Sequence, residues 1–291
     1  MFLDFSQEAF FLNFSRLTNE KGDMPELPEV ETISRQIRAN YLNKRIMEVE
    51  ARPSRIFQNI TAAEFAESLK GRILQAVKRF GKFMYWDLED IFPVFHLGIS
   101  GVFLREKSDS RYPRHIHLTF RFDDRQALYF QDVRKFSKIS LFTSPPTFQE
   151  LGVDPTTTKF TLNKFKQLLN LKEKNIKTFL MDQSIIAGLG NIYVNEALHR
   201  AGISPFRVAN QLNEREAEQL FHSIKEIITS AIQHFGTTYT AYRTVEGNSG
   251  ENQYFLKVYQ KHGEPCGRCG TPIRKVVQNS RSTFYCPNCQ V

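Results

Sequence analysis

Residues 24–31 read Met-Pro-Glu-Leu-Pro-Glu-Val-Glu, and the helical pattern Thr-Ile-Ser-Arg-Gln-Ile follows directly at residues 32–37. Pro28 suits the first turn of a helix, where its missing N–H costs no hydrogen bond. Glu29 and Glu31 would lie near the positive end of the helix dipole, which favours negative charge. The segment therefore predicts a helix that begins at a double-proline entry and carries carboxylates around its N-terminus.

Length and charge limit the classes of protein to consider. A chain of 291 residues can bury one large core or two modest ones. It contains no apolar run long enough to span a bilayer, so we expect no membrane partner. The net charge of +8 and the pI of about 9.3 favour a polyanionic partner.

Residues 1–23 differ in composition from the rest of the chain. They are rich in phenylalanine and carry a net charge of −2, so residues 24–291 carry +10. Without a basic start and a continuous apolar centre, they do not form a secretory signal. Two interpretations stay open: translation starts at Met24, or the extension is genuine and must be cleaved for any chemistry that needs a free Pro25.

The pattern from Arg45 to Phe142 is mostly that of short strands separated by turn signals. Apolar and polar residues alternate over residues 116–122, as in a half-buried strand. Beyond Pro155 the pattern becomes helical, with Asn213 and Glu216 forming a capping-box signal. The expected elements are strands at Arg45–Ala51, Arg72–Phe80, Lys82–Leu88, Ala127–Phe130 and Ile139–Phe142, and helices at Thr61–Leu69, Thr161–Leu171, Ile176–Gln183, Asn191 to before Gly202, and from Asn213.

All four cysteines lie near the C-terminus in two closely spaced pairs. Cys266 and Cys269 are separated by two residues, as are Cys286 and Cys289, and sixteen residues lie between the pairs. This spacing is typical of a closed tetrahedral site for one structural Zn²⁺. Metal binding would supply folding free energy on the order of 10 kcal/mol to this segment.

The double-proline segment resembles the start of the formamidopyrimidine-DNA glycosylases, bifunctional base-excision enzymes that begin Met-Pro-Glu-Leu-Pro-Glu-Val-Glu-Thr. The resemblance covers residues 24–291 and includes the four-cysteine finger. It implies an α+β fold: an N-terminal β-sandwich flanked by helices at 24–155, a helix–two-turns–helix domain at 156–261 and a zinc finger at 262–291, after the 1–23 extension. It also implies a cytoplasmic monomer that acts on damaged double-stranded DNA.

The resemblance assigns four catalytic residues. The secondary amine of Pro25 would attack the sugar, and Glu26 would transfer a proton at the sugar ring. Lys82, in the segment Arg79-Phe80-Gly81-Lys82-Phe83, would act as general acid–base in the elimination steps. Arg281, in the finger segment from Gln278 to Cys286, would bind the phosphate beside the lesion and assist the second elimination.

The resemblance also assigns contacts to DNA. Arg134 and Phe136, in Asp132-Val133-Arg134-Lys135-Phe136, would pair with the orphaned base and intrude into the stack. Ile99 stands where the family usually has a methionine that fills the hole left by the flipped base, so the wedge stays apolar but loses flexibility. The matched contacts to the DNA backbone are His115, Lys177 and Asn191, the last in the loop Gly188-Leu189-Gly190-Asn191.

Three other functions stay open. The chain could be the sibling glycosylase for oxidised pyrimidines, although Leu27-Pro28 and the segment 132–136 favour the purine enzyme. It could be a non-catalytic protein that binds damaged DNA, because a peptide-bonded Pro25 has no basic nitrogen. A basic zinc-ribbon module would leave the first 155 residues unexplained.

Overall fold

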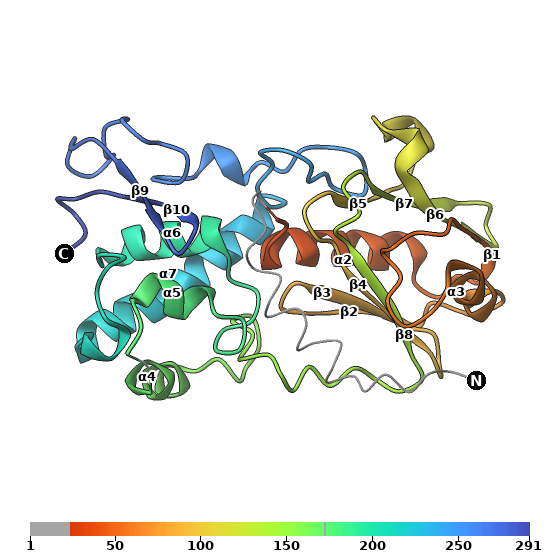
Figure 1. Cartoon of the computed structure of the whole chain (residues 1–291), viewed down its shortest axis with the longest axis horizontal. Helices are drawn as coiled ribbons and strands as arrows, with labels where there is room; N and C mark the ends of the chain where they lie inside the picture. Colours follow the sequence, from red (N-terminus) through yellow and green to blue (C-terminus); the bar gives the residue numbers. More distant parts are fainter. Residues whose placement is uncertain (1–23, 172) are drawn as a thin grey trace. The chain divides into compact units, whose positions relative to one another are not determined.

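The computed structural model describes residues 24–171 and 173–291, so the expectations for residues 1–23 lie outside the described residues. The chain forms two compact units. The first contains the described residues up to Gln149 together with His234–Gln253, and the second contains Glu150–Gln233 and Tyr254–Val291. The predicted α+β class, with strands first and helices later, is confirmed (Figure 1). The predicted boundaries at 155 and 261 remain predictions.

Two four-stranded antiparallel sheets form the first unit. Aromatic side chains from both sheets share one core, in which the ring of Trp86 lies 4.9 Å from that of Phe120 and Phe95 lies 5.4 Å from Phe103. The predicted β-sandwich is therefore present. In order, the sheets contain β1 (Ile46–Ala51), β6 (Ile116–Phe122), β7 (Ala127–Asp132) and β5 (Gly101–Leu104), and β2 (Ala76–Phe80), β3 (Phe83–Asp87), β4 (Phe92–His96) and β8 (Lys138–Phe142).

Two helices accompany the sheets, α2 (Leu27–Tyr41) and α3 (Ala62–Leu69). α2 runs beside β2 and β3 (Figure 1) and buries its apolar face in the shared core. The double-proline entry places Pro28 in the first turn of α2, as predicted. Thr61 caps α3 in a capping box with Glu64. Local side-chain chemistry therefore sets where both helices start.

The strand β6 departs from its expected pattern. The alternation over residues 116–122 predicted one polar, exposed face, but only Arg121 in this strand is exposed. His117 and Thr119 are buried as well, and the Nε2 atom of His117 lies 3.1 Å from the carbonyl oxygen of Asp132. The prediction of an exposed polar face was therefore wrong, because a local alternation does not record which neighbours bury a polar side chain.

Helices dominate the second unit. Its predicted capping box is confirmed, since Asn213 Oδ1 accepts the N–H of Glu216 at 3.0 Å and the Glu216 carboxylate accepts the N–H of Asn213 at 2.8 Å. Asparagine is a common N-cap, so the sequence favours Asn191 as the cap of the helix predicted there. That prediction was wrong, because Gly190 is the N-cap and Asn191 is the first helical residue. The elements are α4 (Leu162–Asn170), α5 (Ile176–Met181), α6 (Asn191–Ala201), α7 (Glu214–Gln233) and the hairpin β9 (Arg274–Gln278) and β10 (Arg281–Tyr285). No helix among the described residues is long and apolar enough to cross a membrane.

Candidate functional site

The N-terminal end of α2 is a buried cluster of carboxylates. Pro25 is buried and directly precedes Glu26, the N-cap residue. Glu26 and Glu29 form a capping box in which Glu29 Oε2 accepts the Glu26 N–H at 2.8 Å. The other oxygen of Glu29 accepts the N–H of Thr237 at 2.7 Å. The carboxylate of Glu29 therefore joins the start of α2 to a segment 208 residues away in the sequence.

Lys82 lies at the tip of the β2–β3 hairpin. The turn consists of Gly81 and Lys82, since Phe80 pairs with Phe83, and Gly81 adopts a φ of 56°, which glycine tolerates without strain. Lys82 is partly exposed. Burial, together with the positive charges of Lys82 and Lys138, lowers the pKa of His96 to about 3. The imidazole beside this turn is therefore neutral at pH 7.

The three predicted wedge residues come from two loops that touch. Ile99 lies between β4 and β5 and is buried, whereas Arg134 is exposed and Phe136 partly exposed after β7. A Cβ on Gly98 would lie only 2.5 Å from the carbonyl carbon of Phe136, so the two backbones pack closely. The guanidinium of Arg134 lies 4.5 Å from the ring centroid of Phe136. The structure thus brings these three residues together, although their roles remain predictions.

Asp132 organises these two loops and was missed as a site residue. It is fully buried, and its carboxylate accepts the N–H of Ser137 at 2.8 Å, the N–H of Arg134 at 3.2 Å and the hydroxyl of Ser100. The sequence could have indicated this role, because an aspartate at the end of a strand often accepts hydrogen bonds from nearby backbone N–H groups. His115, which is predicted to contact the DNA backbone, lies in the 3₁₀ turn Pro113–His115 before β6 and is partly exposed.

In the second unit, Lys177 and Asn191 converge on the finger hairpin. Lys177 is 1% exposed, and its Nζ donates to the carbonyl oxygen of Ser282 at 2.9 Å and to Thr283 Oγ1 at 2.7 Å. Asn191 Nδ2 donates to the same Ser282 carbonyl at 3.0 Å. Both side chains therefore hold the strand that begins at the partly exposed Arg281. Direct phosphate contact by Lys177 and Asn191 remains a prediction.

Glu196 is a second buried carboxylate that the sequence did not single out. It lies on α6, and its two oxygens accept the backbone N–H groups of Lys257, Val258 and Tyr259 at 2.8, 2.9 and 2.8 Å. The sequence feature that could have identified Glu196 is a charged residue within an apolar helical pattern, because a charged side chain is buried only when hydrogen-bonding or ionic partners compensate it. Glu196 thereby holds the segment that leads into the finger.

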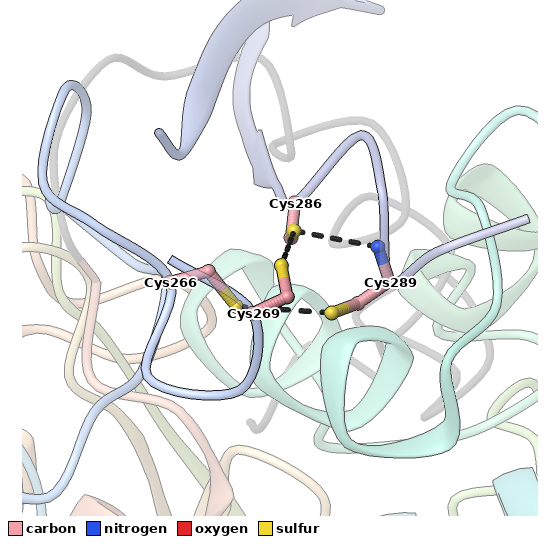
Figure 2. A group of neighbouring side chains, drawn as sticks. All are labelled: Cys266, Cys269, Cys286 and Cys289. Carbon is pink, nitrogen blue, oxygen red and sulfur yellow. Dashed lines mark hydrogen bonds between the residues drawn. The ribbon is translucent and has the colours of Figure 1, made fainter. Parts of the chain in front are cut away.

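The four cysteines form one cluster (Figure 2). Their sulfurs all lie within 4.8 Å of one another, with 3.9 Å between Cys266 and Cys289 and 3.5 Å between Cys269 and Cys286. A tetrahedral Zn²⁺ with Zn–S bonds of about 2.3 Å requires sulfurs roughly 3.8 Å apart. The donor set fits one zinc ion with no open position. The predicted structural Zn²⁺ is confirmed.

Known proteins match most of this chain. Residues 24–139 match the formamidopyrimidine-DNA glycosylase N-terminal domain, residues 151–243 the formamidopyrimidine-DNA glycosylase H2TH domain, and residues 263–291 the zinc finger found in FPG and IleRS. A formamidopyrimidine-DNA glycosylase of Herpetosiphon aurantiacus is 40% identical over 272 residues, which cover 92% of this chain and 100% of the relative.

Several solved structures of similar chains contain DNA. A mutant of the Lactococcus lactis FPG in complex with a Fapy-dG containing DNA is 35% identical, with a TM-score of 0.84 over 91% of this chain and 99% of that chain. The wild-type L. lactis FPG in complex with an oxidised-pyrimidine-containing DNA has the same identity and coverage and a TM-score of 0.82.

Proposed function

Because the chain belongs to the formamidopyrimidine-DNA glycosylase family, a family of DNA glycosylases and abasic-site lyases, we propose that it excises oxidised purines from duplex DNA. The proposed substrates are 8-oxoguanine and formamidopyrimidines, and the enzyme works as a cytoplasmic monomer. The observation that carries the proposal is the placement of Pro25 and Glu26 at the capped end of α2. The L. lactis complex with Fapy-dG containing DNA supports it.

Pro25 is the proposed nucleophile. Its nitrogen is a secondary amine only when Pro25 is the first residue, because a peptide-bonded proline has no basic nitrogen. A free α-amine has a pKa of about 7.7–8.0, far closer to neutrality than that of a lysine side chain. The amine forms a bond to the sugar carbon, the bond from that carbon to the base breaks, and the base leaves with the electron pair and takes up a proton. Opening of the sugar ring then leaves an iminium ion, which acts as an electron sink.

Glu26 and Lys82 are the proposed proton-transfer groups. Glu26 protonates the ring oxygen as the sugar opens, and positioned acids of this kind typically contribute roughly 10²–10⁴-fold. Lys82 moves protons during the two eliminations, in which the iminium draws electrons from the C–H bonds and the two phosphates leave in turn. Arg281 binds the phosphate beside the lesion and assists the second departure.

The base must first be rotated out of the duplex, at a cost of a few kcal/mol. Arg134, Phe136 and Ile99 are proposed to occupy the vacated stack and so to offset this cost. The hydrogen bonds from Ser100, Arg134 and Ser137 to Asp132 hold the two loops together, which supports this role. His115, Lys177 and Asn191 complete the proposed contacts with the DNA backbone.

The test compares two forms of the protein, residues 1–291 and a form that begins at Pro25. The shorter form keeps Pro25 and all residues after it, and the matches to the family domains begin at residue 24. Each form is incubated with a duplex containing 8-oxoguanine and reduced with borohydride. We expect the form that begins at Pro25 to become covalently trapped and to nick the strand. Trapping by the unprocessed long form would refute the assignment of Pro25.

An oxidised-pyrimidine substrate is the second candidate, because the L. lactis relative was solved with oxidised-pyrimidine-containing DNA. Cleavage of matched duplexes that differ only in the lesion discriminates the two, and faster cleavage of the purine lesions supports the first. Salt-dependent binding without cleavage by either form would indicate a non-catalytic DNA-binding protein.

A further inference from the structure

The side chain of Arg79, on β2, bridges the Lys82 turn and the helix α2. Its Nε donates to Glu31 Oε2 at 2.8 Å, and its Nη1 donates to the carbonyl oxygen of Gly81 at 3.0 Å. The Arg79 side chain is only 5% exposed and that of Glu31 only 15%. One buried guanidinium therefore connects a helix carboxylate to the peptide group that leads directly into Lys82.

The two ends of this bridge lie on two elements that carry proposed catalytic residues, the helix α2 that follows Pro25 and Glu26, and the turn that contains Lys82. Glu31 lies five residues after the N-cap Glu26, about 7.5 Å along a helix that rises 1.5 Å per residue. The carbonyl of Gly81 belongs to the peptide bond with Lys82, so holding that oxygen limits the directions that the Lys82 side chain can take. We propose that Arg79, anchored by Glu31, is a positioning residue that holds Lys82 in register with the helix carrying Pro25; this inference rests on the proposed function.

Arginine suits this position for a specific reason. Its planar fork presents several N–H donors at fixed angles, so one side chain can bond two acceptors at once. A lysine would retain the charge beside Glu31 but concentrates its donors on one nitrogen at the end of a flexible stem. Replacement by lysine should therefore keep the ion pair with Glu31 while loosening the hold on Gly81.

Two neighbouring contacts help to separate a role of Arg79 in positioning Lys82 from a role in the stability of the sandwich. Glu31 Oε1 also accepts from Arg35 Nε at 2.7 Å, but Arg35 is 59% exposed and does not reach the turn. The ring of Phe80 stacks on that of Phe148 at 5.2 Å, which supports the hairpin from another direction. Loss of Arg79 should therefore loosen the turn without unfolding the sandwich.

The experiment uses whichever form is trapped by borohydride and measures single-turnover cleavage of an abasic-site duplex across pH. We expect Arg79→Met to slow cleavage about 10- to 100-fold, because misplacement by about 1 Å can cost about 100-fold. Arg79→Lys should recover part of the loss, and DNA affinity should change less than about twofold. Arg35→Met, the matched control on the same carboxylate, should cleave at the wild-type rate.

A double-mutant cycle with Lys82→Met separates positioning from a structural role. If Arg79 acts through Lys82, then Arg79→Met adds no further loss in the Lys82→Met background. If Arg79→Met does not fold, the cycle is repeated with Glu31→Gln, which removes the charge that anchors Arg79 but keeps a hydrogen-bond acceptor. Wild-type cleavage by Arg79→Met, or a full additional loss in the Lys82→Met background, overturns the inference alone. Wild-type cleavage by Lys82→Met overturns the proposed role of Lys82, and absence of trapping in both forms overturns both proposals.

Discussion

Glu29 is the residue whose replacement should most directly damage the start of α2. Its carboxylate is 1% exposed and accepts two backbone N–H groups, from Glu26 at 2.8 Å and from Thr237 at 2.7 Å. Gly236 packs against the same side chain, since a Cβ there would lie 2.8 Å from Glu29 Oε1. The substitution Glu29→Gln keeps the shape but turns one acceptor into an NH₂ donor that faces an N–H.

The cost follows from these two hydrogen bonds. A bond to a charged group contributes about 1.5–3 kcal/mol, and a buried donor left without an acceptor costs about 1–3 kcal/mol. We therefore expect Glu29→Gln to lower the free energy of unfolding by about 2–4 kcal/mol. For a unit of this size, that corresponds to a fall in Tm of roughly 5–15 °C.

Urea unfolding gives the stability, and amide hydrogen exchange of Thr237 reports the local contact. The matched control is Glu246→Gln: the Glu246 side chain is 39% exposed and lies 3.7 Å from Arg105, so its loss should cost less than about 0.5 kcal/mol. Equal stabilities of the two variants, or unchanged exchange at Thr237, would refute the argument that Glu29 joins the segment His234–Gln253 to α2.

Three further predictions concern the second unit and the ion pair. Because Lys177 and Arg281 are both proposed to contact phosphate, Lys177→Met and Arg281→Ala should each reduce the slope of log K against log salt by about one. An unchanged slope for Lys177→Met in a salt titration would show that the buried amine acts only through its hydrogen bonds to Ser282 and Thr283. Chelation of the zinc, or Cys286→Ser, should unfold the finger and abolish strand nicking, as followed by metal content and cleavage; full activity of the metal-free protein would contradict a structural zinc. Burial alone would raise the pKa of Glu31, but Arg79 and Arg35 hold it below its usual value of 4.5. The ion pair therefore stabilises the fold fully above pH 4.5, and its contribution is lost as the pH falls through the lower pKa of the folded state. The free energy of unfolding of Arg79→Met should be about 3 kcal/mol lower than that of the wild type at pH 7, and this difference should disappear below pH 4.5 in acid unfolding measurements.

Features encoded by neighbouring residues were predictable from the sequence. The start of α2 follows from Pro28 and the glutamates around it, and the start of α7 follows from Asn213 and Glu216. The spacing of the cysteines predicted their cluster, because two residues between ligands set the reach of a pair. At the two helix starts, and within each cysteine pair, the determining interaction spans only a few residues.

Features that depend on distant partners were not predictable in the same way. The bond between Glu29 and Thr237 joins residues 208 positions apart, and the bonds from Lys177 to Ser282 and Thr283 span more than 100. A single sequence gives no signal for either pairing. The resemblance identified the residues that matter in the family. That Lys177 is buried and holds the finger hairpin through Ser282 and Thr283 can be seen only in the folded structure.

The most direct test of the proline chemistry locates the covalent bond itself. The borohydride-reduced adduct with 8-oxoguanine duplex is digested, and the modified peptide is sequenced by tandem mass spectrometry. The proposed chemistry predicts that the sugar is attached to the nitrogen of Pro25 at the first position of its peptide. Attachment to a lysine side chain such as Lys82, or to a peptide that still contains Met24, would contradict it.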